Sequence, residues 1–258
     1  MTKIKEAFEN KKAFIAYLSA GDPDLETTEK LIIEMEKNGV DLIEIGIPFS
    51  DPVAEGPVIQ EADLRALKAG TTTEKIFDMV ARVRTKVNIP LVFLTYCNSV
   101  FGYGTEKFMA KCEEIGIDGL IVPDVPYEER EELAPFCEKH NIDLIALVAP
   151  TSEDRVYKIA KASRGFLYIV SSLGVTGVRE KIETDISGII KAAKSVSDIP
   201  CAIGFGISTP EQARELCKTS DGIIIGSAIV RIIGQYGKDC VKPVTEYVRS
   251  IAESVHGI

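Results

Sequence analysis

Hydrophobic residues gather in short runs along the chain, separated by longer amphipathic stretches. Eight of the short runs are apolar and often β-branched, a pattern typical of buried strands. The predicted strands cover residues 14–20, 42–47, 90–96, 119–123, 144–148, 166–170, 201–205 and 222–225.

The longer stretches carry apolar residues at helical spacing on otherwise polar segments. The predicted helices cover residues 27–38, 73–87, 106–115, 127–140, 153–162, 182–195 and 210–218. Cap-forming residue types stand at Thr73, Thr105, Ser152 and Thr209. Further helices are expected at residues 4–10, directly after the eighth strand, and at 241–254.

Strands that alternate with helices pair in parallel. Eight such units in 258 residues match the usual size of a (β/α)8 barrel, about 250 residues. We therefore predict an α/β protein: a single TIM-barrel domain, residues 1–258, with an extra N-terminal helix. An open, doubly wound sheet is the alternative.

Composition limits the possible partners. A net charge of −9 argues against nucleic acid or an anionic membrane surface as a partner. No apolar run approaches the length of about 18 residues that a membrane span needs, and the N-terminus lacks a signal-peptide core. We expect a cytoplasmic protein with reduced, scattered cysteines. His140 and His256 lie in polar stretches and are expected at the surface.

A carboxylate interrupts the second predicted strand. Because a strand alternates its faces, Glu44 shares a face with Leu42 and Gly46, while the neighbouring isoleucines point the other way. A lone buried carboxylate is costly unless it is paired or performs chemistry. The predicted strands contain no Lys or Arg to pair with it. The pattern favours acid/base catalysis; a structural ion pair is the alternative.

A second carboxylate, Glu55, follows just past the end of this strand. It lies in a loop that contains Pro52, Gly56 and Pro57 and that must fold over the barrel mouth. A carboxylate in a largely apolar site has a raised pKa, which suits general acid/base work. The alternative is an ordinary solvated loop glutamate.

Glycine-rich turns end the seventh and eighth predicted strands. They contain Gly204, Phe205 and Gly206 after one strand, and Gly226 and Ser227 after the next. Glycines let backbone N–H groups approach an anion, and a short helix starting near Ser227 would direct its positive end there. Barrels frequently bind phosphate at this place. Residues 174–177 form a third such loop, a possible lid. Ordinary turns are the alternative.

Two kinds of chemistry lack the residues they need. Schiff-base aldol cleavage requires a strand lysine, and metal-assisted chemistry requires clustered ligands; neither pattern occurs. Tyr168, in the sixth strand, could contact substrate or belong to the core. The residues thus predict a phosphorylated substrate handled by two carboxylates.

Six segments together resemble the tryptophan synthase alpha chain family. They are residues 14–23, 44–60 (containing the specific run Pro-Phe-Ser-Asp-Pro), 124–126, 174–177, 204–208 and 226–230. They occur in order over nearly the whole chain, which contains no tryptophan.

The resemblance implies a lyase that cleaves indole-3-glycerol phosphate to indole and glyceraldehyde 3-phosphate by a retro-aldol reaction in tryptophan biosynthesis. By motif position, Glu44 would be the central acid/base, and Glu55 would stabilise or remove the indole N–H proton. The family more often has Asp at the second position, so the longer Glu55 requires the loop to lie slightly further back.

The resemblance also implies a set of substrate-binding residues. Tyr17 stands where a phenylalanine is usual in the indole pocket, Thr176 matches a loop residue near the second carboxylate, and Ser172 replaces a common arginine. The implied substrate contacts are Tyr17, Tyr168, Thr176, Gly177, Phe205, Gly206, Gly226 and Ser227, to which the glycine-rich turn adds Gly204.

The family works with a beta chain that carries pyridoxal phosphate, so no cofactor or metal is expected in this chain. An α2β2 heterotetramer is implied, with no nucleic acid or membrane partner. Asp51, Pro52, Asn98 and Pro126 stand where family members meet the beta chain.

Two other function classes remain to be weighed. A ribulose-phosphate epimerase would need metal-ligand histidines at strand ends, and an indole-glycerol-phosphate synthase would need catalytic lysines; both are missing. A non-catalytic subunit that only docks on a beta-type partner would have no reason to keep a buried Glu44.

Overall fold

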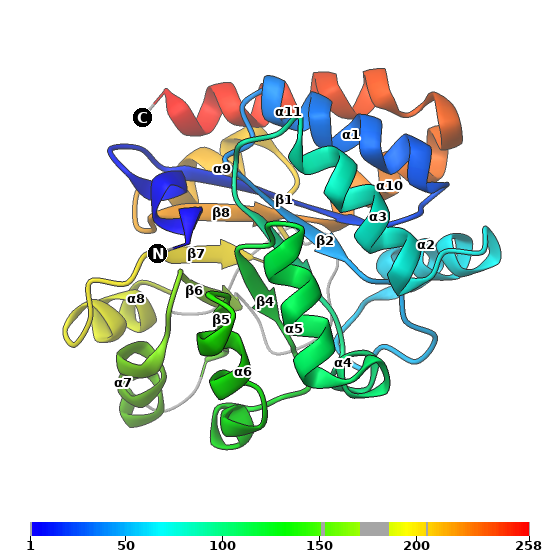
Figure 1. Cartoon of the computed structure of the whole chain (residues 1–258). Coiled ribbons are helices and arrows are strands. Elements are labelled where there is room, and N and C mark those ends of the chain that lie inside the picture. Colours follow the sequence, from blue (N-terminus) through cyan, green and yellow to red (C-terminus); the bar gives the residue numbers. More distant parts are fainter. Residues whose placement is uncertain (1, 151–152, 171–185, 205, 258) are drawn as a thin grey trace.

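The computed structural model of the chain describes residues 2–150, 153–170, 186–204 and 206–257. Eight parallel strands form a closed barrel in sequence order, and β8 pairs back with β1 (Figure 1). This confirms the (β/α)8 barrel and contradicts the open sheet. The strands are β1 (Ala13–Ser19), β2 (Leu42–Gly46), β3 (Leu91–Leu94), β4 (Gly119–Ile121), β5 (Asp143–Val148), β6 (Leu167–Val170), β7 (Cys201–Gly204) and β8 (Gly222–Ile225).

Helices surround the barrel as the periodicity predicts. They are α1 (Leu25–Lys37), α2 (Pro57–Lys68), α3 (Thr73–Arg84), α4 (Cys97–Tyr103), α5 (Thr105–Glu114), α6 (Ala134–Lys139), α7 (Glu153–Ala162), α8 (Ile186–Lys194), α9 (Pro210–Cys217), α10 (Ser227–Tyr236) and α11 (Val241–His256), with short 3₁₀ helices η1 (Lys3–Phe8), η2 (Tyr127–Glu132) and η3 (Gly237–Asp239). The predicted N-terminal helix is therefore 3₁₀ rather than α.

Two helices were not predicted from the sequence, and one predicted helix is split. Helix α2 begins at Pro57, a residue favoured at the first helical position, and α4 has seven residues and buries only Val100. The helix expected at residues 127–140 divides into η2 and α6 because Pro135, near the start of α6, cannot continue a preceding helix.

Only one of the predicted helix caps that can be compared is correct. Thr209 caps α9 through a capping box with Gln212. The N-caps of α3 and α5 are Thr72 and Gly104, so Thr73 and Thr105 are instead the first helical residues. Ser152 lies outside the described residues.

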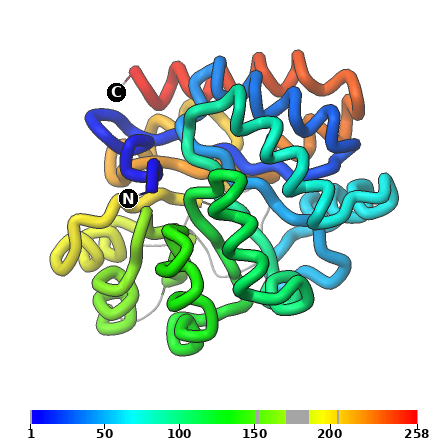
Figure 2. The backbone as a smooth tube through the Cα atoms, viewed as in Figure 1, coloured from blue at the N-terminus to red at the C-terminus, as the bar shows by residue number. Residues whose placement is uncertain are grey.

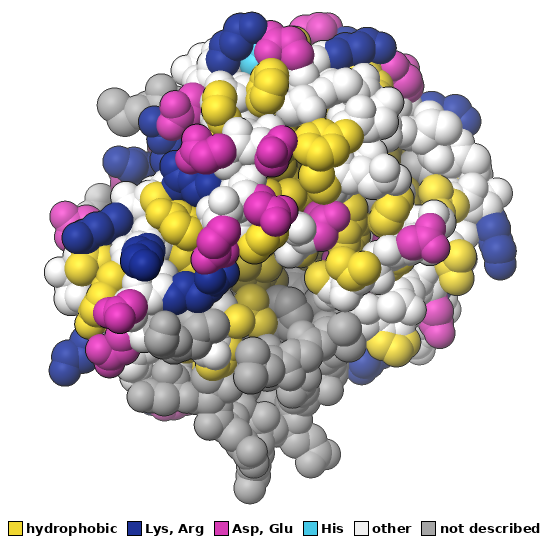
Figure 3. Space-filling view, turned by 90° about the horizontal axis from the view of Figure 1, so that it is seen from below, with side chains coloured by type: hydrophobic (Ala, Val, Ile, Leu, Met, Phe, Trp, Pro, Cys, Tyr) yellow, Lys and Arg dark blue, Asp and Glu magenta, His cyan; other side chains and the backbone are white. Residues whose placement is uncertain are grey.

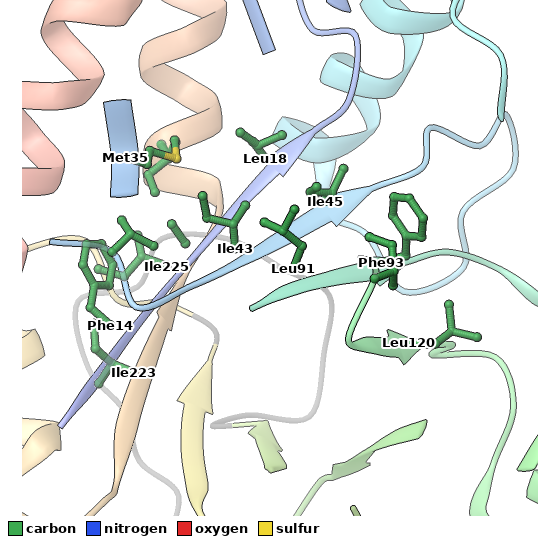
Figure 4. Packing of buried hydrophobic residues seen from close by; sticks show 14 of the residues in the cluster. Phe14, Leu18, Met35, Ile43, Ile45, Leu91, Phe93, Leu120, Ile223 and Ile225 are labelled. Atoms are coloured by element: carbon green, nitrogen blue, oxygen red, sulfur yellow. The ribbon is translucent and has the colours of Figure 1, made fainter. Parts of the chain in front are cut away.

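The outer face of the barrel packs against the helix layer. The buried side chains between the strands and the helices form one hydrophobic cluster. It contains Ile43 and Ile45 of β2, Leu91 and Phe93 of β3 and Met35 of α1 (Figure 4). The opposite face of β2, with Leu42, turns into the barrel. The alternation predicted for β2 is confirmed, so Glu44 points inward.

The 3₁₀ helix η1 packs against the inner cluster of the barrel. Ile4 is fully buried, and its Cδ1 would lie 2.9 Å from a Cβ atom added at Gly119. The ring of Phe8 lies 5.8 Å from that of Phe166. Residues before the first strand therefore fill one end of the barrel, and the opposite end, at the carboxyl ends of the strands, remains for the site.

Helix α11 runs back over α1 and also packs on α9 and α10, so the last helix joins the first in the outer layer (Figure 2). On the face shown in Figure 3, acidic and basic side chains are interspersed and hydrophobic side chains lie between them. No helix of the described residues is long and apolar enough to cross a membrane.

The prediction that both histidines lie at the surface is wrong for His140. This residue is 9% exposed, its Nδ1 lies 2.8 Å from Glu113 Oε2, and its Nε2 lies 3.1 Å from Glu106 Oε1. Packing of α6 against α5 covers it. His256 is exposed, and its Nε2 lies 2.8 Å from Asp41 Oδ2.

Candidate active site

One pocket at the carboxyl end of the barrel gathers seven of the predicted site residues. They come from β1, β2, β6, the loop after β2, and the turns after β7 and β8. These residues are Tyr17, Glu44, Glu55, Tyr168, Gly206, Gly226 and Ser227. Two carboxylates, two phenols and the glycine-rich turns therefore face one space.

Glu44 is buried, and no described residue supplies a counter-charge to it. Its side chain is 1% exposed, and neither carboxylate oxygen has a hydrogen-bond partner among the described residues. Burial, and next the nearby Glu55, raise the pKa of Glu44 to about 8. At neutral pH the group is therefore mostly a carboxylic acid, ready to donate a proton and to take one back.

This raised pKa makes stability depend on pH. Glu44 is protonated in the native state but ionised in the unfolded chain between roughly its ordinary pKa of 4.5 and about 8. The native state thus binds more protons than the unfolded state there, and stability falls as pH rises. We expect the free energy of unfolding in urea to decrease from pH 5.5 to 8.5, and Glu44→Gln to remove part of that decrease. An identical pH dependence in the variant would contradict the raised pKa.

Glu55 is held by its neighbours in the loop after β2. It is 5% exposed, and the Tyr96 hydroxyl donates to its Oε1 at 3.3 Å. The Gln60 side chain donates to the Glu55 carbonyl at 2.7 Å, and the Ala54 N–H donates to the Tyr96 hydroxyl at 3.2 Å. Glu55 is therefore a buried and anchored residue, not a solvated loop side chain.

Two inward glycines make room for the two tyrosines. A Cβ atom at Gly46 would lie 2.3 Å from the Tyr17 hydroxyl oxygen, and one at Gly204 would lie 2.5 Å from that of Tyr168. Tyr168 belongs to the inner cluster and also lines the pocket, so it is a core residue that faces the site, and its contact with substrate stays a prediction. Gly204 supports the site through this packing.

We expect Gly46→Ala to displace Tyr17. For the cleavage that the family resemblance implies, kcat/KM is expected to fall about tenfold, a change of about 1.4 kcal/mol in transition-state binding. Adding Tyr17→Phe removes the atom nearest to the new methyl group and is expected to recover part of the loss. Gly102→Ala is the control, because a Cβ atom there meets no atom of the described residues within 4 Å. Steady-state kinetics of the three variants check the prediction; equal activity of Gly46→Ala and the parent would contradict it.

The turns after β7 and β8 place backbone groups at one side of the pocket. Gly206 has φ +86°, a backbone conformation that favours glycine, and Gly226 is the N-cap of α10. The first N–H groups of a helix have no intrahelical acceptor, so those of α10 are available to an anion. Phe205, Thr176 and Gly177, with Ser172 and the predicted lid, lie outside the described residues.

The sequence did not single out the apolar walls of the pocket. Leu94, Leu147 and Ile224 line it from β3, β5 and β8, and Pro123 follows β4. In the sequence, these residues look like ordinary core positions of buried strands. Only the register of the strands in the barrel shows which inward residues line the pocket and which lie in the core below it. Tyr96 was also missed, although its place just past the end of β3 puts it at the catalytic face.

The four predicted partner-contact residues lie around the same mouth. Asp51, Asn98 and Pro126 are exposed and Pro52 is half-buried. Val53 and Phe101, beside them in the chain, are 72% and 47% exposed. Exposed apolar residues next to a site are compatible with an interaction surface. Within the described residues, no group of three or more His, Cys, Asp or Glu could hold a metal ion, and all six cysteines are free.

A closed barrel with glycine-bearing turns and two buried carboxylates at the carboxyl ends of its strands has the architecture of a barrel enzyme, whose active site lies at this end. Comparison with known proteins makes the class specific. The Tryptophan synthase alpha chain family matches residues 3–256, and the chain belongs to this family.

Individual relatives agree with this assignment. The chain is 50% identical to the tryptophan synthase alpha chain of Alkaliphilus metalliredigens over 246 residues, which cover 95% of this chain and 92% of the relative. The crystal structure of the alpha chain from Legionella pneumophila has a TM-score of 0.89 and 32% identity, covering 100% of this chain and 98% of that one. A tryptophan synthase complex from Pyrococcus furiosus has a TM-score of 0.84 and 33% identity, covering 96% and 99%.

The chain is accordingly a carbon–carbon lyase that cleaves indole-3-glycerol phosphate to indole and glyceraldehyde 3-phosphate, the alpha reaction of tryptophan biosynthesis. This assignment decides against the epimerase, the indole-glycerol-phosphate synthase and the purely docking subunit.

Proposed function

We propose that Glu44 is the acid/base that performs this cleavage and that Glu55 assists it at the indole nitrogen. The observation that supports this most directly is the burial of an unpartnered Glu44 in the pocket that also contains the glycine-rich turns. Neither an ion pair nor solvent stabilises its charge among the described residues, so the group is suited to exchanging protons with a ligand.

In the proposed mechanism, neutral Glu44 donates its proton to C3 of the indole ring. The ring becomes an indolenine that can accept the electron pair of the C3–side-chain bond. The Glu44 carboxylate then takes the proton of the adjacent side-chain hydroxyl, the C–C bond breaks, and its electrons restore the indole. Glyceraldehyde 3-phosphate leaves with the new carbonyl group, and Glu44 is protonated again.

Glu55 stabilises the charge on the indole N–H during this sequence, or accepts that proton. Its position beside Tyr96 fixes the carboxylate at the wall of the pocket. Two neighbouring acids in different surroundings can divide the acid and base roles, and Glu55 contributes to the raised pKa of Glu44.

The substrate phosphate is proposed to bind to backbone N–H groups of Gly206, Gly226 and Ser227, with Gly204, Phe205, Thr176 and Gly177 as further members of the binding set. Tyr17 and Tyr168 form walls for the indole ring beside Leu94 and Ile224. Because the net charge of the protein is −9, its overall field does not attract an anion, and these local main-chain N–H groups have to provide the binding.

The remaining proposals concern the assembly. The match to a tryptophan synthase complex supports a beta chain as partner; we propose an α2β2 arrangement in which Asp51, Pro52, Asn98 and Pro126 meet that chain. Pyridoxal phosphate belongs to the partner, and this chain needs no cofactor.

The whole chain, 1–258, forms a single domain and works in the cytoplasm without nucleic acid or membrane.

The test is indole release from indole-3-glycerol phosphate by the purified chain, with and without a beta chain. Indole and glyceraldehyde 3-phosphate are expected in equal amounts, and the beta chain is expected to raise the rate. No indole under either condition would contradict the proposal.

A further inference from the structure

Asp63 is a buried carboxylate that the mechanism above does not use. It lies on α2, on the same buried face as Ile59, Ala62 and Ala66, and is 3% exposed. Its Oδ1 has no hydrogen-bond partner among the described residues. This helix lies directly behind the pocket, because its Ile59 lines the pocket wall.

One series of contacts leads from Asp63 to the indole pocket. The Ser19 hydroxyl, at the end of β1, interacts with the Asp63 side chain and offsets part of the rise in the pKa of its carboxyl group. The Ser19 and Tyr17 hydroxyl oxygens are 3.1 Å apart and buried. Since Tyr17 also packs over Gly46 and against Gly226, the position of its ring is set from both ends.

A second series leads from the same carboxylate to Glu55. The Phe49 N–H, in the loop after β2, points to Asp63 Oδ2 at 3.5 Å. The Phe49 ring stacks on Tyr96, with centroids 5.3 Å apart and planes at 26°. Tyr96 in turn donates to Glu55. Asp63 therefore contacts the beginning of both series.

The carboxylate at this position is costly for stability. Burial, with a smaller contribution from Asp22, raises the pKa of Asp63 to about 7. Arg65 does not relieve it, because its guanidinium forms a bidentate pair with Asp22 at 2.7 and 2.8 Å. An apolar residue at a buried position with an unsatisfied oxygen is often neutral or stabilising. A residue with only a structural role would thus serve better here if it were apolar.

We propose that Asp63 is a positioning residue for the cleavage reaction, which holds Tyr17 through Ser19 and holds Glu55 through Phe49 and Tyr96. The proposal rests on the roles proposed above for Tyr17 and Glu55. Asp63 does not touch the substrate; it fixes, from behind, the distance between the indole wall and the second carboxylate. Small displacements of positioned groups can lower turnover by orders of magnitude.

Three substitutions on α2 test this role. Asp63→Ala removes both series of contacts and is expected to lower kcat/KM at least tenfold while the melting temperature stays unchanged or rises. Asp63→Asn keeps the shape and one accepting oxygen, and is expected to retain most of the activity. Glu61→Gln, on the exposed face of the same helix, is the control and is expected to match the parent.

Double-mutant cycles identify the route. If Asp63 acts through Tyr17 and Tyr96, then Asp63→Ala costs less in the Tyr17→Phe and Tyr96→Phe backgrounds than in the parent. Full additivity in both backgrounds would overturn the proposal, as would activity of Asp63→Ala within twofold of the parent. Equal loss of activity and melting temperature in Asp63→Ala and Asp63→Asn would show a structural role instead.

These outcomes are separate from the failure of the proposed catalytic mechanism. That mechanism fails if the parent releases no indole or if Glu44→Gln remains active. If the parent is active, Glu44→Gln is inactive and Asp63→Ala is unaffected, only the role of Asp63 is wrong.

Discussion

Glu44→Gln is expected to lower the turnover of indole-3-glycerol phosphate about a thousandfold, within the range of about 10² to 10⁴ that a general acid/base contributes. Glutamine has nearly the same shape as the glutamic acid that predominates at neutral pH, but it can neither donate the proton to indole C3 nor take the hydroxyl proton afterwards. The rate of indole release under saturating substrate measures the effect.

The same variant is expected to fold and to bind. Replacing this buried acid by an amide of similar shape leaves the packing around Leu42 and Tyr168 in place. The melting temperature at pH 8.5 is expected to rise, because the parent gains free energy on unfolding when Glu44 ionises and glutamine cannot ionise. The Kd of a non-cleavable indole phosphate analogue is expected to stay within a few-fold of the parent. Retained turnover in Glu44→Gln would exclude Glu44 as the essential acid/base.

Glu55→Ala is expected to lower kcat about a hundredfold, whereas Glu55→Asp keeps a large part of the activity. Alanine leaves no group to stabilise the indole N–H and leaves the Tyr96 hydroxyl without this acceptor. Aspartate keeps the charge on a side chain one methylene shorter, and the loop held by Gln60 and Ala54 has only to shift slightly. The two variants are compared by steady-state kinetics.

Tyr96→Phe is the matched control for this pair, since it removes the hydroxyl that orients Glu55 and leaves the carboxylate. A loss smaller than that of Glu55→Ala, about tenfold, is expected. If Glu55→Ala and Glu55→Asp are equally active, the loop acid has no catalytic role.

Hydrophobic periodicity predicted all eight strands and the closed barrel, because each strand is a short apolar run with a distinct boundary. It failed for α4, which buries only Val100, and for α2, where Asp63 is one cause. The buried face of α2 follows the helical spacing Ile59, Ala62, Asp63 and Ala66, and a carboxylate in that series interrupts the apolar pattern. The residue that makes α2 hard to recognise in the sequence is thus the same residue that we propose as a positioning residue.

The site could be predicted as far as unusual residues mark it. Glu44 stands out because a charged residue in an apolar strand is rare, and the glycine-rich turns stand out by composition. The contacts that orient Glu55 could not be predicted, because Tyr96 and Gln60 approach it only after β2, β3 and α2 are in place. Likewise, nothing in the sequence shows that Tyr17 and Tyr168 occupy the space above Gly46 and Gly204.

The proposed proton donor lies on β2 and the proposed phosphate contacts follow β7 and β8, all within one hydrogen-bonded ring. The separation between Glu44 and the ends of β7 and β8 is thus set by the width of the barrel, and the turns that follow these two strands start from fixed points. A homologue of the substrate with one carbon more or fewer between the heterocycle and the phosphate could bind at one end but would be out of register at the other. We therefore expect such a homologue to be cleaved more slowly than indole-3-glycerol phosphate.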